Sequence, residues 1–319
     1  MVTLPQSIHL MDGQFQYFSK KGYKMGIISS PGPELIKVNA DLKQGIYMSR
    51  TINPFKDIMS LYRLIKYFIK IKPDIVNAGT PKASFLGILA SFITRVPNRI
   101  YTMRGLRLET EKGLKRLILW VTEKLTCLLA TQVICISPSL LEEARNLKLL
   151  RTKGIVIGRG SSNGIQLKKY PKRKDMESEI NYLKEKLGIN ENDFVLGYVG
   201  RLTKDKGIEE LLLSFKKLQS NFSNVKLLIL GRFEGSKGLS IDVEHEINNN
   251  KNIIYLGFVQ NLEKYYYLMD VLIFPTYREG FGNVSIQAQA AGVPVITTNA
   301  TGAKDTVIDQ VTGFIVPVK

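Results

Sequence analysis

The sequence predicts an α/β protein built from two doubly wound, Rossmann-like domains that face each other across a cleft. Its 319 residues exceed the length at which a single core usually stops growing. Short apolar runs rich in β-forming residues alternate with longer amphipathic segments. A charged stretch at 168–179 separates the two series. We therefore expect an N-terminal domain over residues 1–170 and a C-terminal domain over residues 171–319.

The alternation is typical of βαβ units, so both domains should contain parallel strands. The expected strands are 25–30, 75–78, 99–103, 133–136 and 155–157 in the first domain, and 195–200, 226–230, 253–256, 271–274 and 295–297 in the second. Ligands of open parallel sheets bind beyond the carboxyl ends of the strands, so functional motifs should follow strands. Residues 1–4 look like the tail of a strand, and the strand-like run 314–318 has no helix after it. We therefore expect a chain truncated at both ends.

Composition narrows the function classes. Lysine and arginine exceed aspartate and glutamate by 45 to 28, and the resulting net charge of +17 favours an anionic partner. Cys127 and Cys135 lie in apolar segments, as is typical of reduced cytosolic thiols, and His9 and His245 lack metal-ligand spacing. No leader-like N-terminus or apolar run of about 18 residues is present. We expect a cytoplasmic protein with no metal or other cofactor.

The first motif, VGRLTKDKG, follows a predicted strand that ends at Gly200. It places Arg201 and Lys206 in the loop that leads into a helix, where two cations and backbone N–H groups can hold a diphosphate. A solvated basic turn is the alternative explanation, and this motif alone does not decide between them.

The second motif, FPTYREGFGNVSIQAQAAG, also follows a predicted strand. Glu279 comes just before a predicted helix over 284–291, for which Asn283 is the expected cap. A carboxylate there can accept hydrogen bonds from sugar hydroxyls, while backbone amides at the helix start can contact a phosphate. A glycine-shaped turn would account for Gly280 and Gly282, but it would leave Arg278, Glu279 and Asn283 unexplained.

Together the two motifs resemble the donor half of retaining family 4 glycosyltransferases of the GT-B type. The likeness extends over nearly the whole chain, and it is nearest to bacterial capsule and O-antigen transferases that act on polyprenyl-diphosphate-linked sugars. Other stretches that carry it are TPKASFLGILA, RIYTMRGLRLETEKGLKR, GRGSSNGI, LLILGRFE and TGFIV.

The resemblance implies that Arg201 and Lys206 bind the donor diphosphate and that Glu279 binds the donor sugar, which makes these three the catalytic residues. Gln287 stands where the family has a glutamate that binds the ribose. Its amide oxygen can still accept a hydrogen bond, at a cost on the order of 1 kcal/mol for the lost charge. The implied donor-binding set is Gly200, Arg201, Lys206, Glu279, Gly280, Phe281, Gly282, Asn283, Val284 and Gln287.

The implied acceptor side of the cleft comprises Lys82, Arg104, Ser161 and Asn163. Arg104 replaces a histidine of many relatives, and its role must be electrostatic because arginine does not accept a proton near neutral pH. Residues 77–79 lack the histidines that relatives often show. Lys82 is equally well explained as a solvated lysine in the first turn of a helix.

We therefore expect transfer of a sugar from a nucleotide sugar, most simply a UDP-sugar, to a polyprenyl-diphosphate-linked saccharide, without a metal ion. The protein should lie on the inner face of the bacterial plasma membrane. Two basic amphipathic segments, 55–72 and 111–130, suit an anionic membrane surface, although ordinary sheet-covering helices would have the same pattern.

Three alternatives stay open at this point. A nucleotide-sugar 2-epimerase shares the two-domain architecture, and Gln287 is compatible with a catalytically impaired nucleotide-binding scaffold. A nucleic-acid binder would explain the charge, but the basic residues are dispersed and no recognition module is present, so we expect no nucleic-acid partner. The loop 158–164 lacks the dinucleotide-binding glycine spacing, and no phosphate-loop motif occurs.

Overall fold

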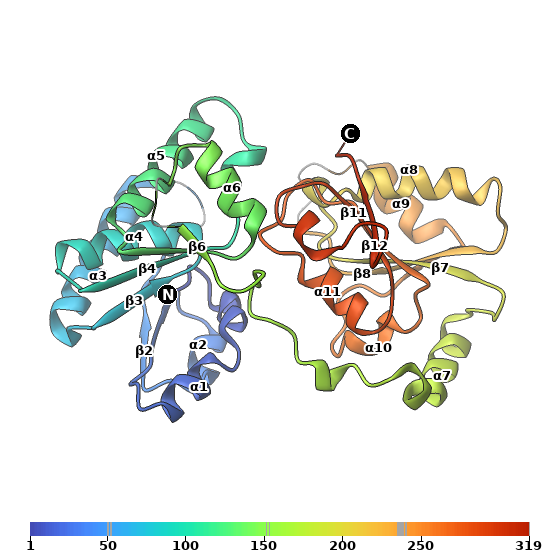
Figure 1. The fold of residues 1–319 in the computed structure, drawn as a ribbon, viewed down its shortest axis with the longest axis horizontal. Helices are drawn as coiled ribbons and strands as arrows, with labels where there is room; N and C mark the ends of the chain where they lie inside the picture. Colours follow the sequence, from blue (N-terminus) through green and yellow to red (C-terminus); the bar gives the residue numbers. More distant parts are fainter. Residues whose placement is uncertain are drawn as a thin grey trace. The chain divides into compact units, whose positions relative to one another are not determined.

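The computed structural model describes residues 1–49, 51, 53–150, 152, 154–234, 239 and 241–318. It divides into two compact units, Met1–Asn163 and Gly164–Lys319 (Figure 1). The stretch 168–179 that the sequence suggested as a linker packs onto the second unit. There the Tyr267 hydroxyl donates to the carbonyl of Pro171 at 2.6 Å, and the Lys169 ammonium lies 2.9 Å from the Glu263 carboxylate.

Helices and short strands alternate along the first unit. In chain order they are η1 (Pro5–Met11), α1 (Gln14–Lys20), β1 (Gly26–Ser29), α2 (Pro33–Lys37), β2 (Leu42–Gly45), α3 (Pro54–Ile71), β3 (Ile75–Ala78), α4 (Pro81–Ile93), β4 (Asn98–Met103), η2 (Arg107–Thr110), α5 (Gly113–Leu129), β5 (Gln132–Cys135), α6 (Pro138–Asn146) and β6 (Gly154–Val156).

The strands of the first unit are parallel. β3, β4, β5 and β6 form one sheet in that order, and β1 pairs with β2. The backbone of Val2 and Thr3 hydrogen-bonds to β1 through Ile28 and Ser30, so the start of the chain runs beside that strand. Strand β2 was not expected, because its sequence LKQG contains one large apolar residue and no apolar run.

The second unit continues the alternation. Its elements are η3 (Leu167–Lys169), η4 (Arg173–Met176), α7 (Glu177–Leu187), β7 (Phe194–Val199), η5 (Lys204–Lys206), α8 (Ile208–Gln219), β8 (Val225–Leu230), α9 (Ile241–Asn249), β9 (Ile253–Tyr255), α10 (Glu263–Tyr266), β10 (Val271–Phe274), α11 (Asn283–Ala290), β11 (Val295–Thr298), η6 (Lys304–Thr306) and β12 (Gly313–Val316).

The second sheet has the strand order β12-β11-β10-β7-β8-β9, with every pair parallel. The chain starts in the middle at β7, builds outward to β9, and then returns to β10 on the other side. This doubly wound order confirms the predicted fold class, and it creates a switch point between β7 and β10, where ligands bind in such sheets. The ten strands expected from the sequence are present, with ends shifted by no more than one residue.

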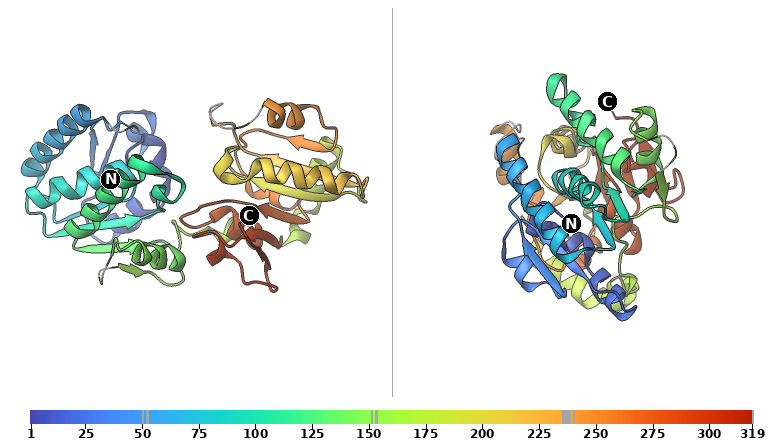
Figure 2. Two further views of the ribbon diagram at one scale, coloured as in Figure 1. Left: turned by 90° about the horizontal axis from the view of Figure 1, so that it is seen from above. Right: turned by 90° about the vertical axis from the view of Figure 1, so that its left-hand side faces the viewer.

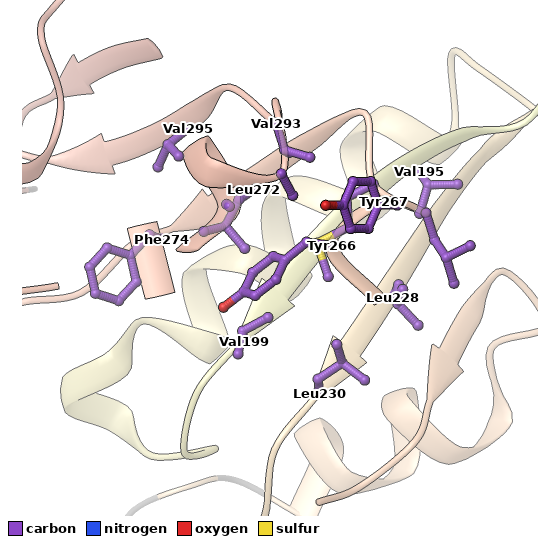
Figure 3. Packing of buried hydrophobic residues seen from close by; sticks show 14 of the residues in the cluster. Val195, Val199, Leu228, Leu230, Tyr266, Tyr267, Leu272, Phe274, Val293 and Val295 are labelled. Atoms are coloured by element: carbon purple, nitrogen blue, oxygen red, sulfur yellow. The ribbon is translucent and has the colours of Figure 1, made fainter. Parts of the chain in front are cut away.

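Buried apolar side chains cover both faces of the second sheet. One cluster contains Ile208, Leu211 and Phe215 of α8, which lies along the strands (Figures 1 and 2). The other contains Tyr266, at the end of α10, and Leu272 of β10, and Figure 3 shows both rings of the pair Tyr266 and Tyr267 within it. The sheet is therefore the middle layer of the unit, and its strand ends are held in fixed positions.

Helix α4 is central in the first unit, where it packs against β3 and β4 and has α3 and α5 as neighbours. Both amphipathic segments noted in the sequence form helices: α3 and α5. Over the ranges given above, no helix is both long and apolar enough to cross a bilayer.

A buried carboxyl group joins α5 to the first sheet. The Tyr101 hydroxyl of β4 donates to the Glu123 carboxylate of α5 at 2.6 Å, and both side chains are buried. Burial raises the pKa of Glu123 to about 7, and the hydrogen bond from Tyr101 offsets only part of this shift. The ionised form of Glu123 is therefore disfavoured in the folded chain.

Glu123→Gln should change how stability depends on pH. Between the ordinary pKa of the unfolded carboxyl and the raised pKa of about 7, the folded state binds more protons, so its stability falls as pH rises. Glutamine removes this loss, which is on the order of 3 kcal/mol. Urea unfolding from about pH 5 to about pH 8 should show the variant gaining on the native chain. Exposed Glu177→Gln is the control, and a Glu123→Gln curve parallel to the native one would contradict the account.

Candidate functional site

The two sequence motifs meet at the carboxyl edge of the second sheet. Lys206 ends the short helix η5 after β7, and Gly207 follows with φ +71°. A Cβ at Gly207 would lie 2.0 Å from the carbonyl oxygen of Pro275, which comes directly after β10. Because glycine permits both this conformation and this approach, the loop after β7 lies directly against the loop after β10.

Lys206 and Glu279 form an ion pair. The Lys206 ammonium donates to the Glu279 carboxylate and, at 3.1 Å, to the carbonyl of Arg278. The two side chains are only 12% and 23% exposed. The structure thus brings together the predicted diphosphate-binding cation and the predicted sugar-binding carboxylate. Each neutralises the charge of the other.

Arg201 lies at the same carboxyl edge of the second sheet. Its guanidinium donates at 2.6 Å to the carboxylate of Glu234, in the loop after β8. Both side chains are 46% exposed, so the pair is screened by solvent and holds the arginine weakly. Burial alone would lower the pKa of Arg201, but the hydrogen bond and charge of Glu234 raise it. Glu234 was not predicted as a site residue, although it ends the quoted stretch LLILGRFE.

A second ion pair ties the two motifs together. Asp205 of η5 accepts a hydrogen bond from the Thr203 hydroxyl at 2.7 Å and lies 3.2 Å from the Arg278 guanidinium. Burial alone would raise the pKa of Asp205, but this hydrogen bond and the nearby Lys206 and Arg278 charges lower it. Asp205 therefore stays ionised and fixes the loop that carries Glu279. Sequence reasoning noted Arg278 in the second motif without assigning it a role, and it did not identify Asp205.

The loop after β11 supports Glu279 from behind. The Glu279 amide donates to the carbonyl of Thr301 at 3.0 Å. A Cβ at Gly302, whose φ is +74°, would lie 2.6 Å from the Glu279 carbonyl oxygen and 2.5 Å from that of Gly280. The backbone of the sugar-binding loop is therefore packed directly on Gly302, a position that the sequence did not identify.

The predicted cap of α11 is wrong. Gly282 is the N-cap and Asn283 is the first helical residue, with no side-chain cap. The carbonyl of Gly282 already accepts the first helical bonds, from Ser285 and Ile286, so the helix starts one residue earlier than expected. The Asn283 amide oxygen is buried and has no hydrogen-bond partner among the residues that the structure describes. Phe281 and Val284 flank this turn, and both are partly exposed.

Gln287 lies one turn further along α11. Its amide oxygen accepts a hydrogen bond from the buried Tyr266 hydroxyl at 3.0 Å. Burial raises the pKa of Tyr266 well above its ordinary value, so this hydroxyl stays a donor. One lone pair of the Gln287 oxygen is thus used within the protein, and a second is chemically available to a ligand hydroxyl. Gly200 directly follows β7, and its amide donates to the Leu230 carbonyl of β8.

The predicted acceptor residues lie in the first unit. Lys82, in the first turn of α4, pairs with Asp57 of α3 and donates to the Thr51 carbonyl at 3.0 Å. It is therefore a neutralised cation rather than a solvated one. Ser161 and Asn163 belong to the loop after β6, and Asn163 bonds both to Gln14 at 2.8 Å and to the Asp12 carbonyl at 2.9 Å.

Arg104 follows β4 and contacts the same loop. Its guanidinium donates to the carbonyl of Ser162 at 2.7 Å and to the Ser162 hydroxyl at 3.0 Å. Three of the four predicted acceptor residues, Arg104, Ser161 and Asn163, thus lie on or against one loop, while Lys82 is held separately by α3.

Both units match models of known protein families. Residues 179–319 match "Glycosyl transferases group 1", and residues 3–137 match "Glycosyl transferase 4-like". The two models together span both motifs and most of the first unit.

Curated relatives and solved structures point the same way. The chain is 47% identical over 319 residues to the capsular polysaccharide biosynthesis glycosyltransferase CapM of Staphylococcus aureus, covering 99% of this chain and 82% of that protein. It is 28% identical to the UDP-Gal:alpha-D-GlcNAc-diphosphoundecaprenol alpha-1,3-galactosyltransferase of Escherichia coli, over 84% of this chain and 69% of that one. Anabaena HepE in complex with UDP and glucose superposes with a TM-score of 0.74 at 21% identity, covering 96% of this chain and 83% of that one. The fold is therefore shared with known glycosyltransferases, and these relatives give no support to the 2-epimerase alternative.

Gly302→Ala should destabilise the second unit and displace Glu279. The added Cβ would overlap two backbone carbonyls, whereas at Gly292, with φ +79°, nothing lies within 4 Å. Gly292→Ala therefore carries only the conformational cost of a left-handed residue, about 1 kcal/mol. Urea unfolding should show Gly302→Ala less stable than this control by a further ~2 kcal/mol, as is typical of overpacking. Equal stability of the two variants would mean that the contact behind Glu279 is unimportant.

Proposed function

This chain belongs to the group 1 and 4-like glycosyltransferases, and we propose that it moves a sugar from a UDP-sugar to a polyprenyl-diphosphate-linked saccharide in the synthesis of a bacterial surface polysaccharide. The observation that carries the proposal is the convergence of Lys206 and Glu279 at the switch point of the second sheet. The E. coli relative is named for a UDP-galactose donor and a diphosphoundecaprenol acceptor, and HepE was solved with UDP, which supports this choice of substrates.

Donor binding should exchange partners at the Lys206–Glu279 pair. A diphosphate competes with the Glu279 carboxylate for the Lys206 ammonium, because it offers more negative charge to the same donor. Glu279 is then released to accept hydrogen bonds from sugar hydroxyls. Arg201, which pairs with the exposed Glu234, supplies a second cation. The bound donor thus replaces the ion pair: its diphosphate takes the place of Glu279 at Lys206, and its hydroxyls take the place of Lys206 at Glu279.

The same cations would assist the reaction. As the bond between the sugar anomeric carbon and the phosphate oxygen breaks, negative charge grows on the nucleoside diphosphate, and fixed cations stabilise it in the transition state. The acceptor hydroxyl oxygen forms the new bond on the same face of the sugar, and its proton passes to the departing phosphate oxygen. We propose retention of configuration and no need for a metal ion, since Lys206 and Arg201 provide the charge that a metal would supply.

Helix α5 offers a surface for the membrane that holds such an acceptor. Its inner face buries Glu123, Thr126 and Cys127. At 100° per residue the opposite face consists of apolar side chains that stay exposed, and Lys115 and Lys124 flank it on either side. These apolar residues are Leu114, Leu117, Val121, Leu125 and Leu128, which are 73%, 55%, 40%, 39% and 63% exposed.

Helix α3 repeats this pattern. Ser60, Leu64 and Phe68 face inward. The outward face carries large apolar side chains beside Lys56, Arg63, Lys66 and Lys70. They are Phe55, Ile58, Met59, Tyr62 and Ile69. Each helix thus covers the first unit with one face and keeps a second apolar face outward, a pattern suited to an anionic bilayer at the inner side of the plasma membrane.

Lys206→Ala should weaken UDP binding at least tenfold, because a charge-assisted contact to the diphosphate is lost. Lys226→Ala is the matched control. Lys226 is similarly buried and pairs with Asp193 at 2.9 Å, but it lies at the amino end of β8. Calorimetric titration with UDP should show the loss only for Lys206→Ala. If both variants bound UDP as the native chain does, the assignment of Lys206 would be incorrect.

The triple variant Leu114→Gln, Leu117→Gln and Leu128→Gln should lose binding to vesicles rich in phosphatidylglycerol without losing stability, because these side chains are exposed. Leu213→Gln combined with Phe222→Gln, at equally exposed apolar positions of the second unit, should bind as before. Vesicle co-sedimentation measures both. Undiminished sedimentation of the triple variant would show that α5 is not the membrane-binding face.

A further inference from the structure

We propose that Arg104 binds the diphosphate group of the lipid-linked acceptor, at the carboxyl edge of the first sheet. This inference rests on the proposed function for the nature of the acceptor. It is carried by the contacts and the charge balance of Arg104 itself, which differ from those of the other predicted cations.

Among the described residues, the Arg104 guanidinium donates only to neutral groups. Besides the two bonds to Ser162, it donates to the carbonyl of Leu10 in η1 at 3.4 Å. Its Nε atom is buried without a hydrogen-bond partner, and no carboxylate of the described residues forms an ion pair with it. Lys82, Lys206 and Arg201, in contrast, are each neutralised by an acidic side chain.

A partly buried cation without a counter-charge is costly to the fold. Arg104 is partly buried, and burial lowers the pKa of its guanidinium, although an arginine still carries its charge at neutral pH. The positive end of α4, which begins at Pro81 next to the same sheet edge, adds to the local positive potential. The missing negative charge can therefore come from a bound anion.

Gly79 makes room for this arginine. A Cβ at position 79 would lie 2.9 Å from the Arg104 Nε atom, so any larger residue at the end of β3 would displace the guanidinium. Gly79 and Arg104 follow neighbouring strands, β3 and β4, and the absence of a side chain at position 79 leaves the space that the guanidinium occupies.

A diphosphate fits this position better than a neutral ligand. Within the described residues the Nη2 group of this guanidinium makes only the long 3.4 Å contact to the Leu10 carbonyl, so a phosphate oxygen can accept a hydrogen bond from it. Such a contact is strong because both partners are charged. Asn163, through its bonds to Gln14 and Asp12, holds the loop that supports the guanidinium. Arg104 is therefore held in place before an anion arrives.

The test titrates farnesyl diphosphate, a short prenyl diphosphate, into the chain saturated with UDP. Arg104→Gln should weaken this binding at least tenfold and leave the affinity for UDP within twofold of the native value. Arg99→Gln is the matched control. Arg99 is the second residue of the same strand, β4, and it also donates to backbone carbonyls, at 2.8 Å and 2.7 Å. It lies at the opposite sheet edge, over the Phe92 ring. Its affinity for farnesyl diphosphate should not change. Farnesol, which lacks phosphate, should bind native and Arg104→Gln chains equally.

Unchanged affinity of Arg104→Gln for farnesyl diphosphate would overturn the proposal, and so would a loss of UDP affinity instead, which would place Arg104 at the donor phosphates. Arg104→Lys is the control for misfolding. It keeps the positive charge but loses the guanidinium group, so its affinity for farnesyl diphosphate should fall between those of the native chain and Arg104→Gln. A native chain that does not bind UDP would refute the proposed donor site, and the titration without UDP would still test Arg104.

Discussion

The ion pair between Lys206 and Glu279 depends on the strand order of the second sheet. The two residues are 73 positions apart in the sequence, and they meet because β7 and β10 are neighbours whose carboxyl ends lie side by side. The contact also needs a close approach of backbones, which Gly207 permits on one side and Gly302 on the other. Topology thus places a cation and a carboxylate together at the switch point, where a doubly wound sheet binds its ligands.

The two units prepare for their ligands in different ways. At the edge of the second sheet the charges are balanced within the protein, through Lys206 with Glu279, Arg201 with Glu234 and Asp205 with Arg278. A donor that carries both a diphosphate and hydroxyls can replace such pairs without leaving a buried charge alone. At the edge of the first sheet the partners of Arg104 that the structure describes are all neutral, so a bound anion would not have to displace an acidic side chain.

Local sequence patterns predicted much of this fold. The apolar runs located the strands, except β2, whose sequence LKQG has no apolar run. The motifs after β7 and β10 located the candidate site. The pairing of charges could not be predicted, because it joins residues far apart in the chain. For this reason the sequence did not reveal that Asp57 neutralises Lys82 or that Glu234 neutralises Arg201. The start of α11 was misplaced by one residue, since the cap depends on backbone bonds to Gly282.

The most direct test of the central claim is a crystal structure of this chain with an intact UDP-sugar bound. The account predicts diphosphate oxygens within hydrogen-bonding distance of the Lys206 ammonium, which would have left the Glu279 carboxylate, and sugar hydroxyls bonded to Glu279. A structure with the diphosphate bound elsewhere and the Lys206–Glu279 pair intact would contradict it.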